Sequence, residues 1–353
     1  MIKEQEAGLP TAEVRRRARL ILLLASFVMA AVQILVAPTR NTGLSMTNLA
    51  GLNKGGSVAL GEWMQSGSVS SDDVAIVGYN DRLFLLNGSN DYYQAYHQDI
   101  NEANAQAEKY LNYADSAFSA CANVAARFLL TIVPNKATIL SDSYPLPLGN
   151  GITPRLSKIL DVKKGHIHSP VNLMRSGGEW FRRNDTHFTY AGNIAYVNDL
   201  MRELDVDVAL SCSEDIHMVE QLGDLGSKFD PPMKEFVQVP AMFEGTGTVF
   251  NLGDPQRKHT GSMFATYNPE CLVEKTIIIF GNSFSETIPS WGMSPYFAHI
   301  FQRYLFYWGN EVDVKLIENL RPDFVLLQTC ERFLSTPPKN LYPALANITA
   351  WPE

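Results

Sequence analysis

The hydrophobic positions of this chain fall into short apolar runs separated by segments with helical spacing. Three runs, at 128–133 (FLLTIV), 275–280 (KTIIIF) and 324–328 (FVLLQ), have the length and β-branched content of strands buried on both faces. Residues 101–125 place apolar side chains at helical spacing, and a further helix is predicted at roughly 296–308. Strands that alternate with helices predict an α/β domain with a largely parallel sheet flanked by helices.

Turn signals and composition divide the rest of the chain. DVAIVGYNDRLFLLNGS (73–89) alternates apolar runs with Gly, Asn and Asp, which predicts a hairpin at the start of a domain spanning 73–340. Residues 38–72 are rich in Gly, Ser, Thr and Asn and are interpreted as a linker. Residues 211–270 are irregular, so we expect an insertion or a cap over the sheet edge, and 341–353 are expected to form a C-terminal tail.

A different kind of segment lies near the N-terminus. Residues 20–37 (LILLLASFVMAAVQILVA) carry no charge, and as a helix they would span about 27 Å, close to the hydrocarbon thickness of a bilayer. The basic residues of 1–19 favour a cytoplasmic tail, so 20–37 is predicted to be one N-terminal transmembrane helix, a signal-anchor, with the rest exported. A cleaved signal peptide and a buried core helix are the alternatives, and no small-x-small site before Pro38 supports cleavage.

Composition excludes some classes of function. The 353 residues have a formal net charge of −8, so we expect no nucleic-acid partner, because phosphate binding requires clustered Lys and Arg. The four cysteines are scattered and form no CxxC pair, so we expect no metal site, and no cofactor is predicted. Export would permit disulfides. A Cys212–Cys271 pair and free thiols are both open interpretations.

The first candidate for chemistry is Ser283, in KTIIIFGNSFSE. A buried strand ends just before it, and the carboxyl edge of a parallel sheet is where clefts form. The backbone N–H groups of a following helix would stabilise an oxyanion there. The alternative is that Ser283 or Ser285 caps a helix, with Glu286 completing a capping box.

The second candidate is the pair Asp185 and His187, in NDTHF. In an extended stretch, residues two apart point the same way, so Asp185 would hold the His187 ring while the other ring nitrogen faces Ser283. Alone, this motif is more typical of a surface loop that caps a helix. Together with Ser283 it predicts a catalytic triad, in which a base activates the weak serine nucleophile.

These motifs together resemble a known family. VGYNDRLFLLNGS, FLLTIVPNKATI, WFRRNDTHFTYAGN, QLGDLGSKF, IIIFGNSFSE and IENLRPDFVLLQTCERFL occur in that order within residues 73–335. They resemble the alginate O-acetyltransferase family (AlgJ/AlgX-like, DHHW-type) of the SGNH hydrolase-like superfamily. The resemblance implies an SGNH-hydrolase-like parallel sheet that is circularly permuted, because D-x-H here precedes the serine by about a hundred residues instead of following it.

The resemblance also marks departures from the family pattern. The strand that usually delivers an oxyanion asparagine corresponds to PDFVLLQTCER, which contains no Asn. The backbone N–H of Ser283 is then the main oxyanion candidate, with Arg332 as a side-chain candidate. Asn282 stands where Asp is common in the family. Lys136 follows a predicted strand end near the site, so Asn282, Arg332 and Lys136 are the candidates for oxyanion or substrate contacts.

Other polar and aromatic groups have two interpretations each. Asp224, in GDLG, is either a turn residue or a substrate contact. His166 and His168 form an HxH pair without an evident third ligand, which favours a solvated loop. The aromatic residues that would either stack on sugar rings or pack in the core are Trp180, Tyr92, Tyr93 and Tyr96.

The resemblance implies an O-acetyltransferase that acts on an exported polysaccharide, alginate or another exopolysaccharide, through an acetyl-Ser283 intermediate. Acetyl-CoA is cytoplasmic, so the acetyl donor outside must be a different molecule. The resemblance implies a multi-pass membrane O-acyltransferase that passes the acetyl group across the membrane. The catalytic domain would then lie in the periplasm, anchored to the bacterial inner membrane. Two alternatives stay open: a carbohydrate acetylesterase with the same triad, and a non-catalytic polysaccharide-binding or assembly subunit.

Overall fold

The computed structural model describes residues 65–88, 90–213, 215–240, 247–253, 259–286, 292–343 and 348–352. All of them belong to one compact unit, Leu52–Glu353. The predicted tail at 1–19 and the predicted membrane helix at 20–37 lie outside the described residues, as does most of the predicted linker. Within the described ranges, no helix is both long enough and apolar enough to cross a membrane.

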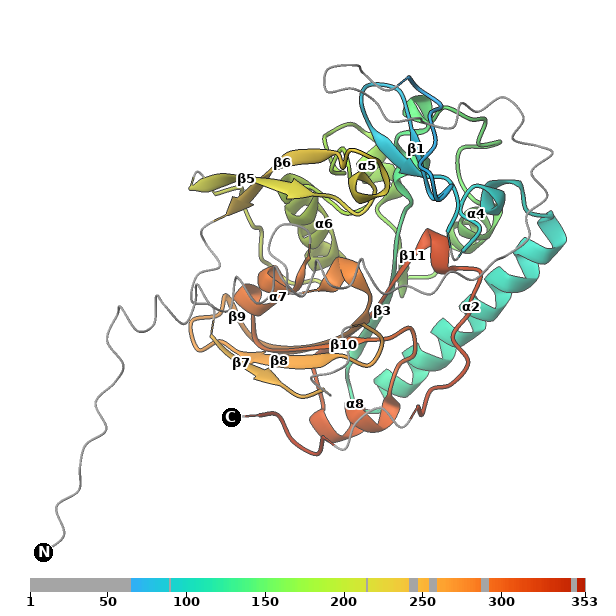
Figure 1. Cartoon of the computed structure of the whole chain (residues 1–353). Coiled ribbons are helices and arrows are strands. Elements are labelled where there is room, and N and C mark those ends of the chain that lie inside the picture. The colour runs from blue at the N-terminus through green and yellow to red at the C-terminus, as the bar shows by residue number, and fades with distance from the viewer. Residues whose placement is uncertain are drawn as a thin grey trace, which may run out of the picture. The chain divides into compact units, whose positions relative to one another are not determined.

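A seven-stranded sheet forms the centre of this unit (Figure 1), in the order β4-β3-β11-β9-β10-β8-β7. The strands are β3 (Arg127–Val133), β4 (Ile167–His168), β7 (Thr248–Asn251), β8 (Met263–Tyr267), β9 (Val273–Gly281), β10 (Phe301–Trp308) and β11 (Phe324–Cys330). The first five strands in the order run parallel, while β8 and β7 add an antiparallel edge. The three strands predicted from apolar runs are β3, β11 and β9, which are neighbours in the sheet.

Helices cover both faces of this sheet (Figure 1). One face is covered by α2 (Ile100–Ala122), α4 (Pro154–Asp161) and α8 (Val314–Leu320), and the other by α6 (Tyr190–Glu203) and α7 (Ser294–Ile300). Side chains alternate along each strand, so that in β3 Leu130 packs on the first face and Leu129 on the second. Burying each such side chain contributes about 1.5–3 kcal/mol, which explains the unbroken apolar runs.

The helix expected at 101–125 is α2. It begins at the Asp99 cap, whose carboxylate accepts the N–H groups of Asn101 (2.9 Å) and Glu102 (3.1 Å). It ends at Ala122, three residues before the predicted end, because the chain turns into β3 through Ala125, which has a positive φ of 61°.

The helix predicted at 296–308 is wrong over most of its length. Only α7, Ser294–Ile300, is helical, and the chain continues directly into strand β10. In β10, Leu305 packs in one core cluster, and Tyr304 and Phe306 pack in the other, which is the two-residue period of a strand. The run YLFYW is apolar at every position, so helical and strand periods cannot be distinguished in it.

The predicted hairpin at the domain start is confirmed: β1 (Ala75–Val77) and β2 (Leu83–Leu85) pair antiparallel. The region 211–270 contains a second hairpin, β5 (Ile216–Leu222) with β6 (Lys234–Pro240), outside the main sheet. Its later part is not an insertion, because β7 and β8 extend the main sheet. The remaining short helices are η2 (Gln94–His97), α3 (Lys136–Ile139), η3 (Ser141–Ser143), α5 (Val171–Arg175), η4 (Gly226–Lys228), η6 (Ser283–Ser285) and η7 (Glu331–Phe333).

Candidate active site

Ser283 begins the short turn η6, directly after the carboxyl end of β9. The side chain of Asn282, not of Ser283, caps this turn, since Asn282 Oδ1 accepts the Phe284 N–H at 3.1 Å. Gln328, on the adjacent strand β11, fixes the turn from the other side. Its Oε1 accepts the N–H of Asn282 (3.2 Å) and the hydroxyl of Ser285 (3.1 Å). The hydroxyl of Ser283 is therefore not used as a cap.

Asp185 and His187 bring a base to that hydroxyl. His187 Nε2 lies 2.8 Å from Ser283 Oγ, and His187 Nδ1 lies 2.6 Å from Asp185 Oδ1. The His187 N–H also donates to Asp185 Oδ1, at 2.9 Å. The structure thus joins the three predicted residues into one hydrogen-bonded chain, although Ser283 is 96 positions from His187. When Nδ1 donates to the carboxylate, Nε2 carries the lone pair that can accept the serine proton.

The carboxylate of Asp185 is almost fully buried, and it stays charged because its surroundings compensate. Arg182 Nη1 lies 3.2 Å from Asp185 Oδ2, and the N–H of Asp224 donates to the same oxygen at 3.1 Å. Burial opposes ionisation, but His187 and Arg182 outweigh it and hold the pKa of Asp185 below its usual range. A charged Asp185 orients the His187 ring and stabilises its protonated form.

Two charged side chains, one buried and one half-buried, fix the backbone of the loop 182–187, which we call the triad loop. The first is Lys136, which is only 3% exposed. Its ammonium donates to four carbonyl oxygens: Leu83 (2.8 Å), Arg182 (2.6 Å), Arg183 (2.8 Å) and Asp185 (3.1 Å). Burial lowers the pKa of Lys136 to about 7. Lys136 therefore faces the backbone of the triad loop, where it acts on the position of Asp185.

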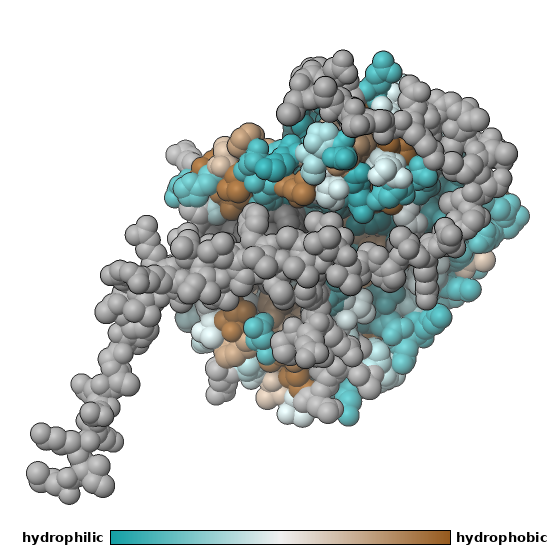
Figure 2. Space-filling view, viewed as in Figure 1, coloured by the Kyte–Doolittle hydropathy of each residue, from teal (hydrophilic) through white to brown (hydrophobic). Residues whose placement is uncertain are grey.

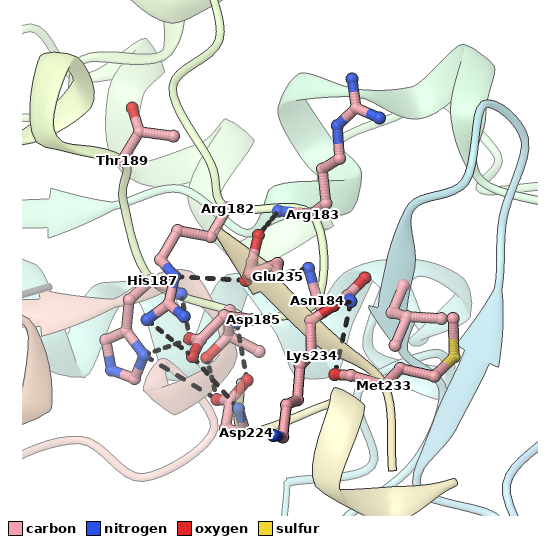
Figure 3. A network of polar contacts seen from close by, with 12 residues as sticks. Arg182, Arg183, Asn184, Asp185, His187, Thr189, Asp224, Met233, Lys234 and Glu235 are labelled. Atoms are coloured by element: carbon pink, nitrogen blue, oxygen red, sulfur yellow. Dashed lines mark hydrogen bonds and ion pairs between the residues drawn. The ribbon is translucent and has the colours of Figure 1, made fainter. Parts of the chain in front are cut away.

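The second group is Glu235, on strand β6. Its carboxylate accepts the N–H groups of Arg183 (2.8 Å) and Asn184 (3.2 Å), and it lies 3.2 Å from Arg182 Nε. Figure 3 shows this carboxylate in contact with Arg182 and with the N–H of Arg183, next to the cluster of Asp185, His187 and Asp224. Because Glu235 lies 52 positions after Arg183, no local sequence pattern indicates this role. The roles of Arg182 and Gln328 were also not predicted, although these residues occur in the motifs WFRRNDTHFTYAGN and IENLRPDFVLLQTCERFL.

Asp224 is the third side chain that holds the triad loop by hydrogen bonds. It accepts both the N–H of Thr186 (2.8 Å) and the Thr186 hydroxyl. Partial burial and then the neighbouring Asp185 carboxylate raise the pKa of Asp224. The preceding Gly223 is required, because a Cβ there would lie 2.0 Å from the Asn184 carbonyl oxygen. This geometry favours the turn interpretation of Asp224.

One group of potential metal ligands occurs among the described residues: Asp185, His187 and Asp224, whose ligand atoms lie within 4.8 Å of one another. The carboxylate oxygens already accept hydrogen bonds, from His187 and Asp224 N–H on Asp185 and from Thr186 on Asp224. A cation would have to displace these donors. The arrangement fits a hydrogen-bonded triad better than a metal centre.

The other predicted contact residues lie close to Ser283. Asn282 Nδ2 donates to Cys330 Sγ at 3.3 Å, so both ends of this amide have partners in the scaffold. Arg332 places its guanidinium 5.8 Å from the ring centre of Phe284, the residue after Ser283. Among the described residues, no carboxylate forms an ion pair with Arg332. Arg332 therefore keeps an available positive charge beside η6, the turn that begins at Ser283.

The remaining candidates have structural roles. His166 pairs with Asp115 of α2 (3.0 Å), and His168 pairs with Asp199 of α6 (2.9 Å). The two histidines therefore point to opposite faces of the sheet and do not form a solvated loop.

The rings of Tyr92 and Tyr96 are buried, which confirms packing for these two. Tyr93 stacks on Tyr144, and Trp180 Nε1 donates to the Met174 carbonyl. Cys212 and Cys271 are free thiols, so the interpretation without a disulfide holds.

Glu331 is a buried carboxylate one residue past β11. It accepts the N–H groups of Asn135 (2.8 Å) and Thr153 (2.9 Å) and the hydroxyl of Thr138 (2.6 Å). Burial raises the pKa of Glu331, yet these three donors favour its charged form. Glu331 thereby ties the segment that carries Lys136 to the strand beside the nucleophile.

Glu331→Ala should lower the free energy of unfolding by about 3 kcal/mol or more, because it leaves three buried donors without their acceptor. Glu318→Ala, an exposed position on α8, should change stability by no more than about 0.5 kcal/mol. Denaturant unfolding of the two variants measures the difference. Equal stability of both variants would show that water replaces the carboxylate without cost.

Fold and site together define an α/β protein in which Ser, His and Asp side chains are joined by hydrogen bonds at the carboxyl edge of a parallel sheet. No family model and no curated protein matches the sequence. Solved structures do match. Bacillus cereus PatB1, determined with a sulfonyl adduct, is 13% identical with a TM-score of 0.52, covering 75% of this chain and 99% of that chain.

Two further structures belong to the families that the motifs resemble. The O-acetyltransferase domain of Pseudomonas putida AlgJ is 15% identical with a TM-score of 0.43, covering 75% of this chain and 94% of that one. A DHHW family protein from Eubacterium siraeum is 12% identical with a TM-score of 0.44, covering 76% and 96%. The PatB1 match shows a shared fold.

Proposed function

We propose that this protein is an O-acetyltransferase of the AlgJ/AlgX-like, DHHW-type family that acetylates hydroxyl groups of an exported polysaccharide. The observation that carries the proposal is the chain of contacts from Asp185 through His187 to Ser283, with distances of 2.6 and 2.8 Å. The six motifs in family order support the same assignment, as does the fold shared with PatB1. The circularly permuted order of the sheet is part of the proposal.

In the first half-reaction, His187 Nε2 takes the proton of Ser283 Oγ as this oxygen attacks the carbonyl carbon of an acetyl donor. The tetrahedral intermediate collapses when the bond to the leaving oxygen breaks, and that oxygen receives the proton from His187. Ser283 is then acetylated. In the second half-reaction, a sugar hydroxyl gives its proton to His187 and attacks the acetyl carbon, and Ser283 Oγ leaves with that proton.

The negative oxygen of each tetrahedral intermediate requires hydrogen-bond donors. The N–H of Ser283 has no acceptor among the described residues, and it lies at the start of a helical turn. Arg332 would add a positive charge from its place over Phe284. Together they would replace the oxyanion asparagine that this strand end lacks.

The proposed cellular setting rests on the sequence. We propose that the N-terminal segment 20–37 anchors the protein in the bacterial inner membrane, with the catalytic domain in the periplasm. A multi-pass membrane O-acyltransferase would then deliver the acetyl group across the membrane. The anchor would keep the two proteins in one membrane plane, which raises their effective concentration.

Product analysis tests the reaction itself. Purified protein is given an activated acetyl ester with and without an oligosaccharide acceptor, and the acetylated sugar and free acetate are quantified. We expect acetylated sugar to exceed free acetate when acceptor is present. Acetate alone in both cases would identify an acetylesterase, because the same acyl-serine would then react only with water.

Covalent labelling tests whether the site reacts at all. A sulfonyl fluoride is the probe of choice, since PatB1 was determined with a sulfonyl adduct. We expect mass spectrometry of peptides to find the label on Ser283. Absence of labelling at every concentration would favour a non-catalytic polysaccharide-binding subunit.

A further inference from the structure

A groove lies between the triad loop and the β5–β6 hairpin, and we call it the hairpin groove. Its volume is about 540 Å³. Its lining includes Arg183 and Asn184 of the triad loop, and Met218 and Phe236 of the hairpin. Known small-molecule sites enclose about 300–1,000 Å³. The hairpin groove is thus large enough for a short stretch of a polymer, and it shares its wall with the loop that carries the triad.

The hairpin side offers unusually exposed apolar side chains. Phe236 is 67% exposed and Met218 is 57% exposed. In the strand register Met218 pairs with Gln238 and Phe236 pairs with Glu220, so the two apolar side chains are diagonal neighbours on one face. Figure 2 shows apolar residues interspersed with polar ones over the hairpin. An exposed aromatic ring beside hydrogen-bonding groups marks a binding surface.

The loop side offers an available cation. The network uses the backbone of Arg183: its N–H donates to Glu235, and its carbonyl oxygen accepts from Lys136 and from the N–H of Leu83. Figure 3 shows the Arg183 guanidinium pointing away from the buried cluster. Among the described residues, no carboxylate lies within ion-pair distance of it. Arg183 thus brings an available cation to the groove whose lining also contains Phe236.

We propose that the hairpin groove binds the acceptor glycan of the acetyl transfer. Phe236 and Met218 would pack against the C–H face of a sugar ring, and Arg183 would donate to its hydroxyl or carboxylate oxygens. A sugar ring has both an apolar face and a rim of oxygens, which matches the apolar and polar residues that line the groove together. A stable protein partner would bury about 800 Å² on each side and would need a wider surface. This inference rests on the proposed transferase function.

The groove is also connected to the triad. Phe236 follows Glu235 in β6, and Glu235 holds the N–H groups of Arg183 and Asn184. Adjacent side chains of a strand point to opposite faces, so Glu235 and Phe236 lie on different faces of β6. The groove meets the triad loop through Arg183 and Asn184, which belong to its lining.

Phe236→Ala and Arg183→Ala test the groove. We expect each to raise the KM for an oligosaccharide acceptor about tenfold. The burst of leaving group from 4-nitrophenyl acetate, which reports acetylation of Ser283, is the internal reference and should change far less. Phe236→Trp retains an aromatic face and should restore acceptor binding. Val249→Ala removes a 57% exposed apolar side chain from β7 and should behave as wild type.

The outcomes separate this proposal from the proposed function. If wild type shows the burst and transfers acetyl to oligosaccharide, but Phe236→Ala and Arg183→Ala match it in acceptor KM, the groove proposal is wrong and the transferase function stands. If wild type shows neither burst nor transfer, the transferase function itself fails. If the variants lose acetylation only in cells, the hairpin binds another protein, which also overturns the groove proposal.

Discussion

Ser283→Ala should reduce acetyl transfer by about 10³-fold or more, the largest effect that we expect from one substitution. The hydroxyl is the atom that would carry the acetyl group, and His187 Nε2 lies 2.8 Å from it. Without it, no acyl intermediate forms, and neither the oxyanion donors nor the held acceptor can compensate. Transfer to oligosaccharide by purified protein measures the loss, and polymer acetylation in cells measures it under native conditions.

Ser116→Ala is the matched control, because this serine is exposed on α2 and far along the chain from the site. It should retain full transfer activity. Both variants should unfold at the same temperature as the parent protein, since each removes one partly exposed hydroxyl. Polymer acetylation that survives Ser283→Ala in cells would disprove the acyl-serine mechanism.

The sequence was sufficient for the parts of the fold and site that depend on local pattern. β3, β9 and β11 are buried on both faces, and a run of apolar β-branched residues at strand length has few other interpretations. Ser283, His187 and Asp185 were found because each lies in a short motif with its own chemistry. We expected their three side chains to lie together because a serine that follows a buried strand lies at the carboxyl edge of the sheet, where clefts form.

The support of the triad loop could not be predicted, because it depends on backbone groups and on distant partners. The ammonium of Lys136 binds carbonyl oxygens, which every residue has, so no pattern of side chains indicates where it will lie. From its place after a strand, Lys136 was expected to contact substrate. Burial places it behind the loop instead. Glu235 reaches the same loop from a hairpin that showed no clear period in the sequence.

Lys136→Met should lower the kcat of acetyl transfer by about 10- to 100-fold. The substitution keeps the length of the side chain but removes a cation that donates to four carbonyl oxygens, three of them in the triad loop. The loop would no longer hold Asp185 against His187, and a displacement of about 1 Å at a reacting group costs roughly 10²-fold in rate. The KM for a small acetyl donor should change little, because Lys136 is buried away from substrate.

Lys136→Met should also be less stable than the parent protein. The experiment must therefore separate the effect of lower stability on kcat from the effect of a displaced triad loop. We expect the free energy of unfolding to fall by about 3 kcal/mol, because buried carbonyls lose their donor. Rates are therefore compared well below the unfolding temperature, with Lys109→Met, an exposed lysine of α2, as the control. Hydrogen exchange provides the decisive measurement: amides of 183–187 should exchange faster in Lys136→Met, while those of α2 should not. An unchanged kcat with faster exchange would mean that Asp185 keeps its place without Lys136, and that Glu235 and Asp224 are sufficient to position the triad loop.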